Sequence, residues 1–256
     1  MSQNFADLLK VTAHRPWPLP DEPWVMTQSW HDLLFAHWPV DVRMLKETLP
    51  AGLELDLYSG QAWVGVIPFH MTNVAPRGLP AMPWVSAFPE LNVRTYVRHG
   101  GKPGVFFFSL DAGSALTVLG ASAWYALPYF MADARLRVTP HGVRFRSRRD
   151  HAGAPAAEFV AEYRATGPVR TRPRARLSRW LTERYCAYTL GVDGGVARTE
   201  IHHAPWPLQT AEVTITSNSL LAAAGLDVAG PPRFAHYAAG VDALIWPPVP
   251  AAARAA

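Results

Sequence analysis

Two segments joined by a short turn constrain the fold of this chain most strongly. Apolar and polar residues alternate along residues 91–98 (LNVRTYVR), and an apolar segment at 105–111 (VFFFSLD) follows the turn at 99–104 (HGGKPG). Alternation on both sides of a turn rich in glycine is typical of a β-hairpin. The start of the second segment, residues 106–108, is apolar on both faces. The hairpin is therefore predicted to lie deep in the fold.

Further strand patterns are spread along the whole chain. Two more hairpins are predicted, residues 53–58 with 62–72 and residues 135–139 with 143–149. Single strands are predicted at residues 158–166, 185–190, 196–203 and 212–215, and residues 30–38 are predicted as a strand or a short helix. Because strands occur throughout, we expect one α+β domain, mainly β, over residues 1–256.

Helices are predicted to be few and short. Asp41 has the character of an N-cap, before a helix that ends at Pro50. Other helices are predicted at residues 114–127, 177–184 and 219–224. Residues 76–89 contain four prolines and are expected to form a long irregular loop.

The composition excludes several classes of protein. With 49% hydrophobic and 17% charged residues, the chain is a folded globular protein and not a disordered one. Cys186 is the single cysteine, so no internal disulfide forms. Residues 1–10 lack the pattern of a secretory signal. Residues 112–132 carry no charge but are interrupted by polar residues, glycines and Pro128, which favours a buried helix over a membrane span. We therefore expect a cytoplasmic protein without a membrane partner.

The basic residues are almost all arginine, and they are unevenly placed. The chain has 21 arginines and three lysines, and residues 135–184 hold 13 arginines against four acidic residues. Arg144, Arg146 and Arg148 alternate, so on a strand they share one face. Such a face suits a polyanion, but no nucleic-acid-binding motif accompanies it. We therefore favour a solvated outer face and expect no specific nucleic-acid partner.

A row of polar residues in the first hairpin is the main candidate site. In an extended strand Glu90, Asn92, Arg94 and Tyr96 share one face. Arg94 has the chemistry to hold a carboxylate with two hydrogen bonds, and Glu90 has the chemistry of an acid or base. The alternative is a solvated outer face. On the residues alone, the two interpretations stand equal.

Other catalytic and metal-binding patterns are absent from the sequence. The histidines, including His70 at the end of a predicted strand, show no HxxxH or HExxH spacing, so no metal is expected. No GxSxG, GxGxxG or GxxxxGK[ST] motif occurs, and no cofactor is expected. Cys186 is interpreted as a buried small side chain.

Several motifs together resemble one known family. They are WHDLLFAHW (30–38), LPAGL (49–53), AWVGV (62–66), ELNVRTYV (90–97), GVFFFSL (104–110), LPY (127–129), ERY (183–185) and HAPW (203–206). In this order and spacing they resemble the YqjF-like family of uncharacterised bacterial proteins, over about residues 23–246. That family is placed with the acetoacetate decarboxylase-like superfamily. The resemblance implies a closed or cone-shaped β-barrel with flanking short helices and a central pocket, into which Glu90 and Arg94 would point.

The lysines argue against the mechanism of that superfamily. Acetoacetate decarboxylases form a Schiff base through a buried lysine. Here residues 114–134 contain no lysine, and Lys10, Lys46 and Lys102 have no apolar surroundings in the sequence. The resemblance therefore implies the fold of this superfamily, whereas the lysines argue against its Schiff-base chemistry.

The resulting hypothesis is a pocket that binds a small carboxylate or carbonyl compound. Glu90, Arg94 and Tyr96 are the candidate catalytic residues. Arg94, Asn92, His70 and Tyr129 are the candidate substrate-binding residues, with His70 a further candidate for acid–base chemistry. A non-catalytic small-molecule-binding protein is the first alternative, and a polyanion-binding protein is the second. Self-association into a homo-oligomer is compatible with the sequence.

Overall fold

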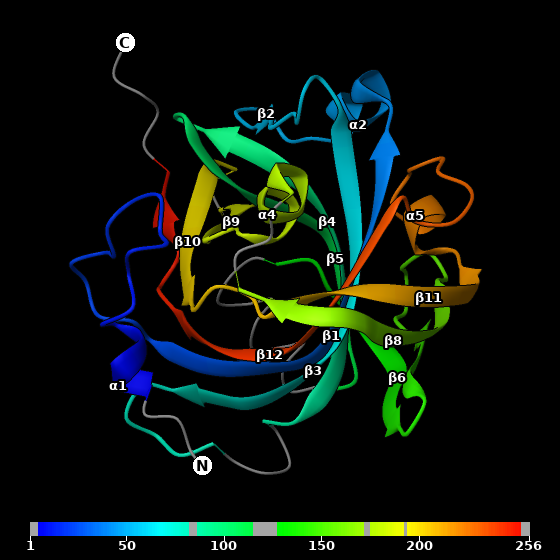
Figure 1. Ribbon diagram of the computed structural model, residues 1–256. Coiled ribbons are helices and arrows are strands. Elements are labelled where there is room, and N and C mark those ends of the chain that lie inside the picture. The colour runs from blue at the N-terminus through cyan, green and yellow to red at the C-terminus, as the bar shows by residue number, and fades with distance from the viewer. Residues whose placement is uncertain (1–4, 82–85, 115–126, 172–174, 192–193, 252–256) are drawn as a thin grey trace.

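A computed structural model of the chain describes residues 5–81, 86–114, 127–171, 175–191 and 194–251, and these are mainly β (Figure 1). The strands are β1 (Met26–Val40), β2 (Glu54–Leu55), β3 (Ala62–Pro76), β4 (Phe88–His99), β5 (Lys102–Ala112), β6 (Tyr129–Thr139), β7 (Gly142–Arg149), β8 (Glu158–Arg170), β9 (Cys186–Leu190), β10 (Val196–His203), β11 (Leu208–Asn218), β12 (Phe234–Ile245) and β13 (Val249–Pro250). The helices are α1 (Phe5–Leu8), α2 (Val42–Glu47), α4 (Arg176–Thr182) and α5 (Leu220–Ala223).

The strand pairings return to their starting point. β12 pairs with β1, and the pairings continue through β3, β4, β5, β9 and β10 back to β12. A second run, β6–β7–β8–β11, leaves this cycle at β5 and rejoins it at β12. Figure 1 shows this second run extending away from the other strands. Helix α4 packs against side chains of β3, β4, β5 and β9, in a cluster that includes Tyr96 and Leu181.

Strands β1, β3 and β4 form a wall that is covered on both faces. Even-numbered apolar residues of β1, such as Leu34, pack with Phe145 of β7 and Phe159 of β8 in the largest core cluster. The odd-numbered neighbours Leu33 and Phe35 belong to a different cluster on the other face. Successive side chains of a strand point to opposite faces, so one set of strands serves two apolar layers.

Most predicted elements are confirmed. β4 and β5 are the predicted first hairpin, and β6 and β7 are the predicted hairpin of residues 135–149. The side chain of Asp41 accepts hydrogen bonds from the backbone N–H groups of Arg43 and Met44 at 2.8 and 3.0 Å, which caps α2. Residues 30–38 are strand and not helix.

The alternating arginines of β7 lie on its exposed face, as predicted. Arg144, Arg146 and Arg148 are exposed, whereas Val143 and Phe145 between them are buried. Arg144 pairs with a glutamate of β8 across the sheet. The face is therefore a solvated outer surface of the second run of strands.

One predicted hairpin is wrong, and two strands, β12 and β13, were not predicted. β2 pairs with Arg98 and Val97 of β4, and not with β3. The carboxylate of Asp56 accepts from Arg98 at 2.6 Å, which draws this segment towards β4. β12 was not predicted because its sequence, FAHYAAGVDALI, is rich in alanine and interrupted by glycine.

Two other sequence predictions concern helices. The predicted helix at residues 114–127 lies almost entirely outside the described residues. Among the residues that the structure describes, no helix is long and apolar enough to cross a membrane.

Candidate functional site

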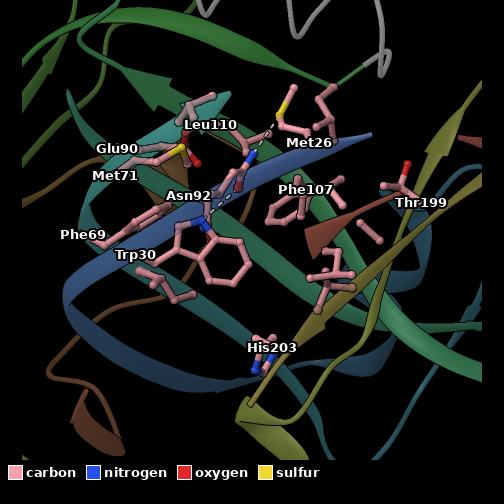
Figure 2. Close-up of a pocket in the computed structure, with 18 of the residues that line it drawn as sticks. Met26, Trp30, Phe69, Met71, Glu90, Asn92, Phe107, Leu110, Thr199 and His203 are labelled. Carbon is pink, nitrogen blue, oxygen red and sulfur yellow. Dashed lines mark hydrogen bonds between the residues drawn. The ribbon is translucent and has the colours of Figure 1, made fainter. Parts of the chain in front are cut away.

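A cavity of about 1000 Å³ lies against the face of β1, β3 and β4 that is turned away from the largest core. Its wall is mostly apolar, with aromatic and aliphatic side chains from β1, β3, β5 and the segment after β10. Figure 2 shows Trp30, Phe69 and Phe107 around the same space as Glu90 and Asn92 of β4. A large apolar cavity with a few polar groups is the usual form of a small-molecule site.

The polar row of β4 is buried, and three of its four members line this cavity. The exposed fractions are 2% for Glu90, 6% for Asn92, 9% for Arg94 and 0% for Tyr96. Glu90, Asn92 and Arg94 line the cavity, and Tyr96 does not. Alternation places all four on one face, so the row is not a solvated outer surface.

Glu90 is a carboxyl group in an apolar environment. Burial raises the pKa of Glu90 from its usual 4.5 to about 8. The Tyr129 hydroxyl donates to Glu90 Oε2 at 3.1 Å, which opposes the rise in pKa, and the nearby Asp111 carboxyl reinforces it. Glu90 is therefore mostly protonated at neutral pH and has a proton to donate. Tyr129, from the start of β6, also lines the cavity.

Arg94 is a buried guanidinium with no carboxylate partner among the residues that the structure describes. Its Nη2 donates to the backbone carbonyl of Leu181 at 3.2 Å, and its Nε has no hydrogen-bond partner among the described residues. The guanidinium lies 5.6 Å from the centre of the Phe35 ring. Other buried arginines pair with acids, as Arg149 does with Asp111, but within the described part of the chain Arg94 has no such ion pair. Burying a cation without a paired anion costs free energy, so binding of an anion beside Arg94 would be favoured.

Asn92 adds a second unused polar atom to the cavity wall. Its Oδ1 is buried and has no hydrogen-bond partner within the part of the chain described. Buried polar atoms in folded proteins are normally paired. Asn92 lies between Glu90 and Arg94 on the same face of β4. The row therefore offers a proton donor, an amide and a cation in sequence.

Tyr96 and His70 lie outside the cavity. The Tyr96 hydroxyl donates to the Leu181 carbonyl at 2.7 Å and lies 2.7 Å from Nε2 of His37, so its hydrogen bonds are made within the protein. His70 has the opposite orientation to its neighbours Phe69 and Met71, which line the cavity. Burial and a neighbouring histidine lower the pKa of His70.

Sequence reasoning gave no role to Arg184, which also lines the cavity. Its Nη1 donates to Asp56 Oδ2 at 2.6 Å, while its Nη2 is buried and has no partner among the described residues. The Arg184 guanidinium lies 4.9 Å from the centre of the Tyr96 ring, and that of Arg94 lies 5.8 Å from it. The motif at residues 183–185 was the one sequence signal that pointed to this region.

The three lysines of the chain all lie away from the cavity wall. Lys10 pairs with Asp7 at the surface, Lys46 is exposed on α2, and Lys102 donates to Glu200 at 2.7 Å. Cys186 is buried, and burial raises the pKa of its thiol to about 12. No cluster of three or more metal-binding side chains occurs in the described residues.

The family of the chain follows from comparison with known proteins. A family model for DUF2071, described as an uncharacterized conserved protein, matches residues 27–242. The chain belongs to the DUF2071 family. It is 45% identical over 229 residues to the uncharacterized protein YqjF of Bacillus subtilis, with 90% of this chain and 93% of that protein covered. The resemblance to YqjF-like proteins is thus confirmed.

The fold of this DUF2071 chain is similar to that of acetoacetate decarboxylases. The structure of acetoacetate decarboxylase from Legionella pneumophila matches with a TM-score of 0.61 and 15% identity, over 96% of this chain and 95% of that one. The enduracididine biosynthesis enzyme MppR, solved in complex with pyruvate, matches with a TM-score of 0.62 and 12% identity, over 93% of both chains. At these identities the likeness shows the fold alone.

Proposed function

We propose that the chain is a single domain whose cycle of strands forms a closed or cone-shaped barrel, with the cavity as its ligand site. The site would bind a carboxylic acid or carbonyl compound of small-molecule size. The observation that carries this proposal is Arg94, which is buried in the cavity wall with an unpartnered Nε and no acidic partner among the described residues. The complex of the structural neighbour MppR with pyruvate supports the same ligand class.

Each residue of the row has a role in this proposal. Arg94 would hold the ligand carboxylate through charge-assisted hydrogen bonds. Asn92 and Tyr129 would orient the ligand, and Glu90 would donate a proton to a carbonyl or carbanion. The pKa of about 8 for Glu90 supports this role, because the group holds its proton at neutral pH. The chemistry would be proton transfer without an imine, because no lysine of this chain lines the cavity.

Thermal unfolding with pyruvate and acetoacetate tests the binding step. A ligand at a hundred times its Kd stabilises the folded state by about 2.7 kcal/mol, or roughly 5–10 °C in a chain of this size. We expect this rise for the wild type and for E90Q, and its loss in R94Q. Arg137→Gln, on the exposed face of β6, is the matched control and should retain the rise. Equal rises in R94Q and R137Q would refute the role of Arg94.

Borohydride reduction tests the exclusion of an imine. Treatment of the protein with pyruvate and sodium borohydride, followed by intact mass measurement, should leave the protein mass unchanged. A stable adduct on Lys10, Lys46 or Lys102 would contradict the proposal that the chemistry proceeds without a lysine.

The apolar character of the cavity wall supports a second candidate, a non-catalytic binding protein. Such a protein needs Arg94 but not the proton of Glu90. Solvent exchange of the protons beside the ketone of 7-oxooctanoate, followed by NMR in deuterated solvent, separates the two candidates, because this keto acid is long enough to place its ketone near Glu90 while its carboxylate lies at Arg94. Faster exchange with the wild type than with E90Q would support catalysis. Binding without any exchange would support the non-catalytic candidate.

A further inference from the structure

The polar groups of the cavity are spread along its length and not gathered at one point. Glu90 and Arg94 are four residues apart on an extended strand, so their Cα atoms are about 13 Å apart. The register of β4 against β3 places Arg94 opposite Gly65 and Glu90 opposite Phe69. A three-carbon keto acid held at Arg94 would fill only the part of the cavity beside that residue.

The inner end of the cavity is lined by two arginines and lies against helix α4. Arg94 and Arg184 both line it, and each has one buried nitrogen without a partner in the described residues. Asp56 pairs with Arg184 and with the exposed Arg98, so its single negative charge is shared between two guanidinium groups. Beyond Arg94, helix α4 covers the strand, with the Trp180 ring 4.7 Å from that of Tyr96. An anionic head group entering the cavity would therefore stop at the two arginines.

The opposite end of the cavity reaches the surface. Arg77, Leu79 and Pro80, which follow β3, line the cavity and are exposed, Leu79 to 63%. The wall between the rim and Arg94 carries Glu90 and Asn92 but is otherwise mostly apolar, and Figure 2 shows Phe69, Met71 and Leu110 beside these two residues. An apolar wall gains free energy only from an apolar ligand surface. A compact polar acid bound at the arginines would leave the apolar part of the wall towards the rim without a contact.

We infer that the ligand is an elongated amphipathic monocarboxylate. Its carboxylate would lie at Arg94 and Arg184, and its apolar body would extend along β3 and β4 towards the rim. This inference rests on the proposed function and adds the size and polarity of the ligand. A cavity of about 1000 Å³ has room for such a molecule, at the upper end of the range for small-molecule sites.

A series of straight-chain acids tests this inference. Butanoate, hexanoate, octanoate and decanoate would be titrated below their aggregation concentrations, with the intrinsic fluorescence of Trp30 and Trp206 in the cavity wall as the signal. Full burial of the added carbons predicts a fall in Kd of about tenfold for every two methylene groups. Decanol, with the same body but no charge, should bind the wild type roughly tenfold or more weakly than decanoate.

Variants of the arginine locate the head group. Arg94→Gln should lose roughly tenfold or more in affinity for decanoate and change little for decanol. The exposed-face control R137Q should match the wild type with both. If R94Q does not fold, the preference of the wild type for decanoate over decanol still tests the charged end.

The remaining outcomes separate the two proposals. Binding of pyruvate through Arg94 without any gain along the acid series would overturn the elongated ligand and leave the proposed function standing. A gain with chain length but equal affinity for decanoate and decanol would overturn the carboxylate end, and with it the role of Arg94 in both proposals. Absence of binding by pyruvate and by every acid of the series would overturn both.

Discussion

Glu90 should make the stability of this protein fall as the pH rises. Its carboxyl group is buried to 2% exposure, and burial raises its pKa from 4.5 to about 8. Between these two pH values the folded chain keeps a proton that the unfolded chain releases. The free energy of unfolding therefore decreases by about 1.4 kcal/mol per pH unit. The contribution is fully present below pH 4.5, and its loss is complete once the pH passes 8.

The magnitude follows from integrating this difference in bound protons. Between about pH 5 and about pH 9, Glu90 alone should lower the free energy of unfolding by about 4 kcal/mol. Glu90→Gln cannot ionise, so its stability relative to the wild type should improve by the same amount over that interval. All other titrating groups are common to both proteins and cancel in the comparison.

Urea denaturation of both proteins at several pH values measures this effect. The matched control is Glu162→Gln, because the Glu162 side chain is 62% exposed and is solvated in the folded and unfolded chain alike. Its stability relative to the wild type should change little with pH. If the wild type and E90Q show parallel pH profiles, Glu90 is ionised in the folded protein, and its role as a proton donor fails.

Three further predictions concern buried groups outside the cavity wall. Tyr96→Phe removes the hydroxyl that donates to the Leu181 carbonyl and should cost about 1–3 kcal/mol in chemical denaturation; an unchanged midpoint would contradict this. Asp111→Asn removes the charge that pairs with the buried Arg149 at 2.9 and 3.1 Å, and it should lower the free energy of unfolding by about 3–5 kcal/mol. A loss smaller than that of an exposed ion pair would show that the pair is solvated. Cys186, buried and with its pKa raised to about 12, should react with a thiol reagent only after unfolding, and immediate labelling of the native protein would refute its burial.

Local sequence patterns predicted much of the strand framework. The β4–β5 hairpin was predictable because alternation and a glycine-containing turn act within a few residues of one another. The strand at β2 was predicted but its pairing with β4 was not, because that pairing depends on Asp56 contacting Arg98 and Arg184, the second of which lies 128 residues away in the chain. β12 was missed because its weak strand propensity is compensated by pairing with three other strands.

The candidate site was predictable only in part, for a similar reason. Period-two alternation correctly placed Glu90, Asn92 and Arg94 on one face of a buried strand. Tyr96 has the same alternation but is covered by α4, whose Leu181 is 85 residues further along the chain. The burial of Arg184 in the cavity wall and the apolar residues opposite β4 likewise depend on tertiary packing, which no local pattern encodes.

The double-faced wall of β1, β3 and β4 has a consequence for folding accuracy. In β4, Leu91 and Val93 face the largest core, and Asn92 and Arg94 face the cavity. A slip of one residue in the pairing would exchange the two sets, placing an arginine in the dry core and leucine in the cavity. The polar groups proposed to bind the ligand therefore also destabilise an incorrect register of β4. A single-residue insertion or deletion within β4 would remove the binding residues and the stability of the fold in one event.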